Sequence, residues 1–147
     1  MACLETYATL RIFSRSVHPG EVSRILRIAP TEQTPMDPTS KYRPRREYHY
    51  WGWSSSRQLK SLDGIEHVRA VIALLDGKEH KLAQLRTNGC EIDVCCYWVS
   101  SGQGGPFLDN SALTHLSHFG LSIWWDVYFG EEDEYAEDAS KGAAGVS

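Results

Sequence analysis

TYATLRIF, residues 6–13, is a stretch in which apolar side chains alternate with side chains that carry a polar group. Successive side chains of an extended chain point to opposite faces, so a period of two residues predicts a β-strand with one buried face. The expected buried face is Ala8, Leu10 and Ile12, and the expected outward face is Tyr7, Thr9 and Arg11.

Residues 48–55, 91–99 and 121–129 alternate in the same way and are predicted to be strands. Gly52 stands between two tryptophans, which indicates a bulge or a close approach to the backbone. Residues 30–47 hold four of the six prolines and no apolar period, so they are predicted to form a loop. The expected inward side chains are Ile92, Val94, Cys96 and Trp98 in the third strand, and Leu121, Ile123, Trp125, Val127 and Phe129 in the fourth.

Apolar residues at three- and four-residue spacing predict three helical segments between these strands. Residues able to cap a helix or to occupy its first turn stand at their starts, and glycine or proline follows their ends. The last helix is expected to direct Ala112, Leu113, Leu116 and Phe119 inward. The segments are residues 18–28, residues 63–88 with a break at Asp76-Gly77, and residues 109–120.

The resulting order is β-α-β, a broken helix, then β-α-β. Half-polar strands are typical of antiparallel sheets that are covered on one face. We therefore predict an α+β fold for residues 1–130, with a ferredoxin-like, four-stranded, largely antiparallel sheet and helices mainly on one face. A permuted strand order is the alternative.

The net charge of −4 comes from 15 basic and 19 acidic residues, and it is unevenly spread. Residues 131–147 hold six acids and one base, and the rest of the chain has 14 bases and 13 acids. We expect residues 131–147 to be an acidic, disordered tail, with attraction of a basic partner as the alternative. The basic cluster at residues 41–46 is expected to be a solvated loop or, alternatively, a contact for an anion or acidic partner.

Neither a signal peptide nor a membrane-spanning helix is expected, because residues 1–6 lack a basic or apolar run and the longest aliphatic run is only 71–75. A cytoplasmic location follows as the default. Cys3, Cys90, Cys95 and Cys96 form no CxxC pair and are predicted to be reduced, structural thiols. No metal or other cofactor is expected. His115 and His118 have a metal-compatible spacing but no further ligands, so an exposed helix edge is favoured.

Five segments of the chain resemble the bacterial family called domain of unknown function 4279. They are TYATLRIF, HPGEVSRILRIAPT, the strand around Trp51 and Trp53, CYWVSSGQGGPFL and LSIWWDVYF. The resemblance covers residues 7–129, and its most specific part is residues 97–106. It implies a small cytoplasmic bacterial α+β domain and supplies no catalytic residues.

The polar side of the predicted sheet carries aromatic side chains among charged ones, a composition typical of interface cores. Acidic residues on the same side oppose the phosphates of RNA. This side could be covered by the broken helix, by a second copy of the chain or by a foreign protein. The candidate partner-binding residues are Arg11, Asp93, Tyr97, Trp124, Asp126 and Tyr128.

A glycine-rich turn follows the third strand, at the position where phosphate-binding loops lie in other folds. It lacks the spacing of those loops, and Pro106 removes one backbone amide. A structural turn is the first interpretation. Binding of a small anion or polar ligand at Ser100, Ser101 and Gln103 is the alternative.

No Ser-His-Asp or Cys-His signature is visible, so a non-enzymatic role is predicted. The leading hypothesis is a protein-binding module, specifically an immunity or antitoxin-type inhibitor whose acids mimic the phosphates of a nuclease substrate. Its partner would be a protein such as a toxin, or a second copy, and neither nucleic acid nor membrane. The alternatives are a small-ligand sensor near Arg11, Tyr97 and the turn at residues 100–105, and an unrecognised enzyme.

Overall fold

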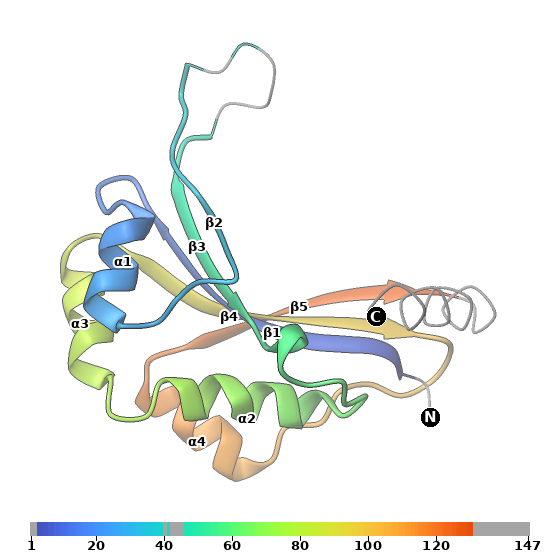
Figure 1. The fold of residues 1–147 in the computed structure, drawn as a ribbon. Coiled ribbons are helices and arrows are strands. Elements are labelled where there is room, and N and C mark those ends of the chain that lie inside the picture. The colour runs from blue at the N-terminus through green and yellow to red at the C-terminus, as the bar shows by residue number, and fades with distance from the viewer. Residues whose placement is uncertain (1–2, 40, 42–45, 131–147) are drawn as a thin grey trace.

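A computed structural model describes residues 3–39, 41 and 46–130, and within them the chain forms one mixed sheet and four α-helices (Figure 1). The sheet order is β2-β3-β1-β4-β5. The central strand β1 is antiparallel to both β3 and β4, and β4 is parallel to β5. The strands are β1 (Cys3–Ser14), β2 (Glu32–Thr34), β3 (His49–Ser54), β4 (Glu91–Ser100) and β5 (Ser122–Phe129). The helices are α1 (Pro19–Leu26), α2 (Gly64–Leu74), α3 (Glu79–Thr87) and α4 (Asn110–His118), with a short 3-10 turn η1 (Ser55–Arg57).

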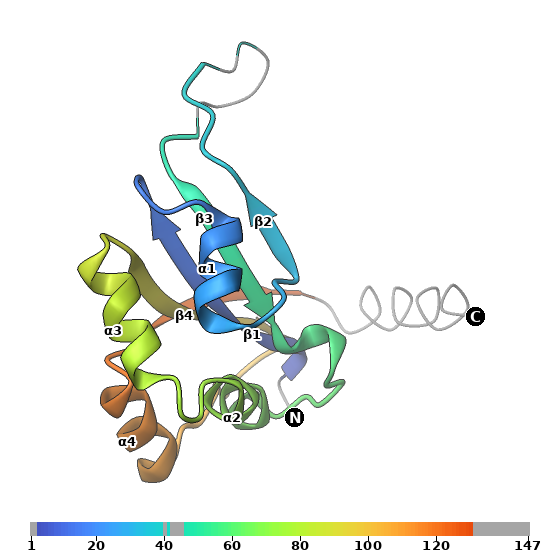
Figure 2. The same cartoon turned by 60° about the vertical axis from the view of Figure 1, so that its left-hand side comes forward.

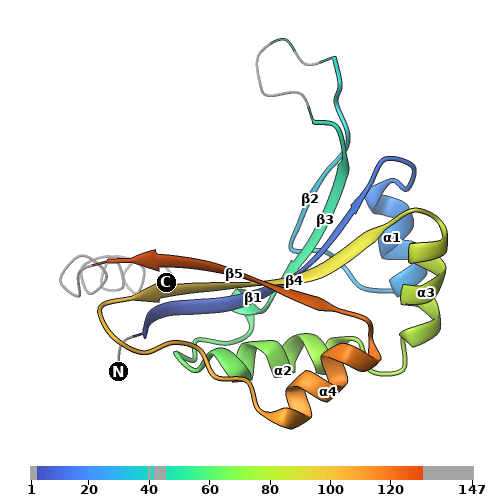
Figure 3. The ribbon, with the colours of Figure 1, turned by 180° about the vertical axis from the view of Figure 1, so that it is seen from behind.

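The alternation along residues 6–13 positions the core. Ala8, Leu10 and Ile12 are each at most 1% exposed and belong to the main apolar cluster. Side chains from all four α-helices belong to the same cluster, because every helix packs on this side of the sheet. Figures 1 and 3 show the helices together on one side of the sheet and no helix of the described residues on the other. The prediction of helices mainly on one face is thereby confirmed, and cover of the polar face by the broken helix is excluded.

The helices α2 and α4 begin where their capping residues predict. Asp63 accepts a hydrogen bond from the amide of Ile65 at the start of α2, and Asp109 accepts one from Ala112 in α4. These carboxylates satisfy amides that have no partner within the first helical turn. After α4 the chain turns at Gly120, whose φ of +68° is readily adopted only without a Cβ.

The predicted loop at residues 30–47 is wrong in part, and with it the prediction of a four-stranded sheet. Glu32–Thr34 forms β2, which pairs antiparallel with β3, and Asp37 bridges to Arg46 further along the same hairpin. Figure 2 shows β2 at the edge of the sheet beside β3. Three residues are too few for an alternating pattern, and the flanking prolines are tolerated beside an edge strand.

The ferredoxin-like arrangement is not confirmed, although the α+β class is. The sheet is mixed, because the crossover through α4 returns the chain parallel to β4. The connection through α1 leads into the β2–β3 hairpin, so β3 lies antiparallel to β1. The connection through α2 and α3 leads from β3 to β4, which is also antiparallel to β1.

The expected inward face of the last strand is buried only over the first part of the strand, so the expectation that Trp125, Val127 and Phe129 are buried is wrong. Trp125, Val127 and Phe129 are 39%, 46% and 81% exposed, and Leu113 of α4 is 51% exposed. Only the start of the strand packs on the core, through Ile123. Figure 3 shows why: β5 runs on past the helices beneath it, so none of the described helices covers its second half.

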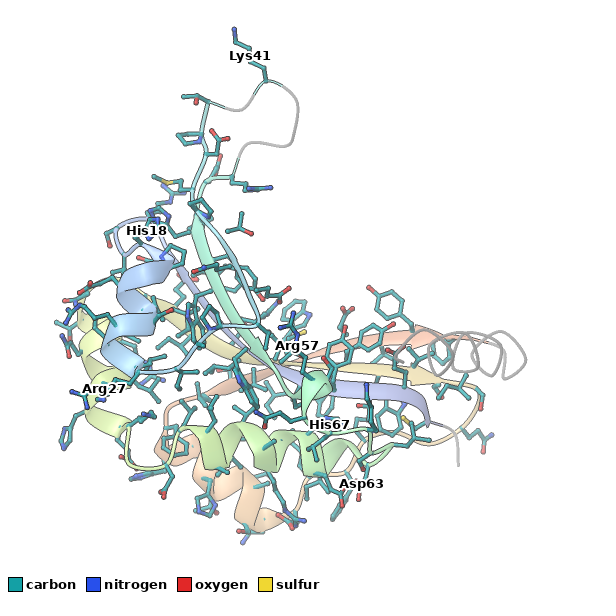
Figure 4. All side chains as sticks on the ribbon, viewed as in Figure 1. His18, Arg27, Lys41, Arg57, Asp63 and His67 are labelled. Atoms are coloured by element: carbon teal, nitrogen blue, oxygen red, sulfur yellow. The ribbon has the colours of Figure 1, made fainter. Side chains whose placement is uncertain are left out.

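A buried polar network attaches η1 to the sheet and to α2. The hydroxyl of Ser55, which is fully buried, accepts a hydrogen bond from the amide of Ala8 at 3.0 Å. It also lies 2.6 Å from Nδ1 of His67, whose Nε2 is 2.8 Å from the carbonyl of Ser61. His67 is labelled in Figure 4. Since Ser55 is inaccessible, we interpret this Ser–His pair as structural.

No helix among residues 3–39, 41 and 46–130 is long and apolar enough to cross a membrane. The predicted acidic tail and most of the basic cluster, residues 42–45, lie outside the described residues.

Candidate functional site

The side of the sheet opposite the helices is hollowed into a groove of about 390 Å³. The groove runs over β1 and β4, with residues of the β2–β3 hairpin and η1 along one side and Asp126 of β5 on the other. Figure 4 shows Arg57 of η1 on this helix-free side. The lining residues are Glu5, Tyr7, Thr9, Arg11, Thr31, Glu32, Tyr50, Ser54, Ser56, Arg57, Cys95, Tyr97 and Asp126.

Three of the six predicted partner-binding residues, Arg11, Tyr97 and Asp126, line this groove. Strand register brings them together: Tyr97 lies opposite Asp126 on β5 and opposite Tyr7 on β1. Residues in register on neighbouring strands share one face, so the prediction from alternation placed these side chains on the correct side.

Arg11 and Asp93 form the central ion pair beside the groove. The guanidinium donates from Nε at 2.8 Å and from one terminal nitrogen at 2.7 Å, one bond to each carboxylate oxygen. Both side chains are partly buried, and these hydrogen bonds are the first cause of the raised pKa of Arg11. A bidentate pair of this kind fixes the arginine in place and satisfies much of its charge.

Three tyrosines form a continuous aromatic row across the same face. The rings of Tyr7 and Tyr97 are stacked with centroids 4.7 Å apart, and Tyr97 lies 5.4 Å from Tyr128. Tyr128 is half exposed. Aromatic pairs at these distances stabilise each other and form a rigid surface.

Two residues of the groove wall, Tyr50 and Glu32, were not among the predicted site residues. Glu32 lies in the segment that was predicted to be a loop. Tyr50 donates a hydrogen bond of 2.6 Å to the carboxylate of Glu32. Burial is the first cause of the raised pKa of Tyr50, followed by this bond and the charge of Glu32. The signal in the sequence was Gly52: a Cβ there would stand 2.4 Å from the Tyr50 hydroxyl, so the predicted close approach to the backbone is confirmed.

The other two candidate residues, Trp124 and Tyr128, extend the face along the edge strand β5. Trp124 is 62% exposed. On the opposite side of the same strand a second hollow of about 570 Å³ lies between β5 and α4, lined mainly by leucines, Ile123 and Trp125. β5 therefore presents large apolar side chains on both of its faces.

The glycine-rich turn does not contribute to the groove. Ser100 is buried, and its hydroxyl donates to the carbonyl of Gly102 at 2.7 Å, so it is engaged within the turn. Ser101 and Gln103 are exposed outside both hollows. The structure thus separates the candidate ligand-binding residues of the turn from Arg11 and Tyr97.

The remaining polar candidates are placed apart from one another. Cys96 is buried in the core while its neighbour Cys95 faces the groove, where burial raises the pKa of the thiol. His118 lies beside Glu79 at 3.4 Å, and Nδ1 of His115 is 2.8 Å from a carbonyl of its own helix. Among residues 3–39, 41 and 46–130 no three His, Cys, Asp or Glu side chains are grouped to hold a metal ion.

No curated protein and no solved structure matches the chain. Residues 4–130 match the family described as Domain of unknown function (DUF4279), and this match includes the five strands except for Cys3, together with the whole groove. The chain therefore belongs to this family of unknown function.

Proposed function

We propose that the protein is a non-enzymatic protein-binding module and that it binds through the helix-free face of its sheet and the adjoining strand β5. One observation carries this proposal. Among the described residues nine large hydrophobic side chains are exposed, and five of them lie on β5. The five are Trp124, Trp125, Val127, Tyr128 and Phe129.

The presence of five exposed hydrophobic side chains on one edge strand has a physical consequence. An edge strand offers unpaired backbone amides and carbonyls, and proteins usually protect it with charges or prolines. β5 has one charged residue, Asp126, and no proline. Contiguous apolar surface beside a polar groove is typical of a protein interface, where aromatic side chains dominate the binding energy.

In its specific form the proposal is an immunity or antitoxin-type inhibitor that covers the functional surface of a toxin. Steric occlusion needs no catalytic group in the domain. The carboxylates of the face, among them Asp126, support binding to a basic surface by complementary charge.

The proposal is tested by affinity capture from a native, nuclease-treated lysate with tagged wild-type protein. The Trp124→Ala, Tyr128→Ala variant would be run in parallel. Phe107→Ala is the matched control, because Phe107 is 70% exposed and aromatic but lies outside the sheet. We expect one near-stoichiometric protein with the wild type and the control, and its loss with the β5 variant.

Retention of that protein by the β5 variant would refute the binding face. If only the chain itself is recovered, light scattering at several concentrations decides whether a second copy occupies β5. An empty capture, with a monomer at every concentration, would refute the protein-binding role.

The groove favours a second candidate, binding of a small polar ligand. Its volume is within the range of ligand sites, and Arg11 and Tyr97 of the ligand-sensor hypothesis both line it. A thermal-shift screen discriminates, because a ligand at 100 times its Kd stabilises the folded state by about 2.7 kcal/mol.

A further inference from the structure

Carboxylates outnumber the available cations around the groove. The charge of Arg11 is already matched by Asp93 through two hydrogen bonds. The other charged residues of the lining are the acids Glu5, Glu32 and Asp126 and a single further base, Arg57. The groove therefore has an excess of negative charge, and it opposes anions such as phosphate.

The tyrosines respond to this excess. The pKa of Tyr7 is raised first by burial and then by the carboxylates of Glu5, Glu32 and Asp126. The pKa of Tyr128 is raised mainly by the charge of Asp126. The carboxylates that disfavour a tyrosinate favour a positive charge at the same place, whereas burial of Tyr7 disfavours a charge of either sign.

The aromatic row supplies the second element of a cation site. The stacked pair of Tyr7 and Tyr97 lies in register with Asp126, so aromatic rings and a carboxylate stand side by side on three adjacent strands. Aromatic rings attract cations, and the planar guanidinium also stacks on them. A carboxylate beside the ring adds an ion pair to that attraction.

We infer that the groove receives an arginine side chain of the bound protein, placed against the row of Tyr7 and Tyr97 and paired with Asp126 and Glu5. This inference rests on the proposed function, since it names the chemistry by which the helix-free face recognises its partner. The volume of the groove, about 390 Å³, leaves room for a side chain, and its negative charge complements a basic segment.

The test uses the full chain, labelled with ¹⁵N, and two probes. The first is the peptide acetyl-Gly-Arg-Gly-amide, and the second is the same peptide with citrulline, which keeps the shape of arginine but has no charge. We expect saturable shifts of amide signals along β1, β4 and β5 with the arginine peptide only. Equal binding of the citrulline peptide, shifts mapped elsewhere, or no saturation with either peptide would overturn the inference.

Two variants make the assignment specific. Glu5→Gln with Asp126→Asn removes two groove charges, and we expect the Kd of the arginine peptide to rise about fivefold or more. Glu66→Gln is the control, because Glu66 is an exposed carboxylate on α2, on the helix side of the sheet. An unchanged Kd in the groove variant, or an equal rise in the control, would refute the role of these carboxylates.

The peptide titration and the affinity capture test different claims, so failure of one can be distinguished from failure of the other. If the captured protein is lost with the Trp124→Ala, Tyr128→Ala variant but retained by the Glu5→Gln, Asp126→Asn variant, the binding face stands and the arginine site falls. If the peptide binds in the groove and no protein is captured, the cation site stands and the protein-binding role falls.

Discussion

At the scale of single residues, the shape of the groove depends on a missing side chain. Gly52 lies opposite Arg11 on β1 and opposite Glu32 on β2. The Tyr50 side chain reaches over the vacant position and bonds to Glu32. A glycine within a strand weakens that strand, so we attribute this one to the space that the tyrosine needs.

The first prediction concerns Gly52→Ala. The new Cβ would lie 2.4 Å from the Tyr50 hydroxyl and 3.0 Å from Cγ of Glu32, so the ring must move and its hydrogen bond must break. We expect the pKa of Tyr50 to fall toward its ordinary value. The measurement is an NMR titration of labelled tyrosine rings from neutral to alkaline pH.

The raised pKa of Tyr50 also determines how the stability of the folded state changes with pH. Because the folded state raises the pKa of Tyr50, its contribution to stability is complete below about pH 10 and is lost as the pH rises further. That alkaline loss should be smaller in Gly52→Ala. Gly102→Ala is the control, because no atom lies within 4 Å of its new Cβ. Identical tyrosine titrations for wild type and Gly52→Ala would contradict the account.

At the scale of elements, β5 has two parts with different roles. Its first residues continue from a buried turn at Leu121 and pack on the core through Ile123. Its later residues extend past α4 with apolar side chains on both faces. The strand therefore holds hydrophobic surface that no other part of the described chain buries.

A matched pair of phenylalanines tests this division. Phe119, at the end of α4, is 4% exposed, and Phe129, at the end of β5, is 81% exposed. We expect Phe119→Ala to lower the free energy of unfolding by about 3–5 kcal/mol. Phe129→Ala should change it by less than about 0.5 kcal/mol.

Urea unfolding at two protein concentrations measures both substitutions. An equally large loss for Phe129→Ala would contradict the division of β5. If that loss also depended on protein concentration, a second copy of the chain would be covering the strand.

An element could be predicted from the sequence when it is long and when its residues have the same neighbours along its whole length. The strand at residues 6–13 is flanked by strands on both sides and faces helices along its length, so its burial follows its alternation. β2 has only three residues and forms because β3 lies beside it, a cause that no local pattern contains. Along β5 the alternation was correct, but burial depends on how far the helix layer extends.

The groove shows the same limit. Alternation placed Arg11, Tyr97 and Asp126 on one face, since strand geometry alone fixes that property. The contribution of Glu32 required the strand order, which brings β2 to β3 across the sheet from β5. Register between strands distant in sequence is set by tertiary packing, so Gly52 could indicate a close approach to the backbone but not that Glu32 would take part in it.

At the scale of the whole molecule, the sheet has internal strands that are bonded on both sides and two edge strands that are less protected. β1 has hydrogen-bonded neighbours on both sides, and β4 does too. β2 and β5 are the two edges of the sheet, and they flank the groove. A binding face built in this way has a rigid floor, formed by β1 and β4, between borders that can adjust to a partner.

Amide hydrogen exchange measured over the full chain tests this distribution of stability. Exchange from the paired amides of β1 and β4, such as those of Leu10 and Val94, should require unfolding of the whole protein, because both strands are buried and bonded on each side. Amides of β2 should exchange fastest among the strands, since three residues at an edge open without disturbing the core. Amides of β5 should fall between these extremes, with protection greatest near Ile123, where the strand packs on the core. Protection of β2 equal to that of β1 would mean that the hairpin is as rigid as the floor, and the groove would then have a fixed shape to which its partner must conform.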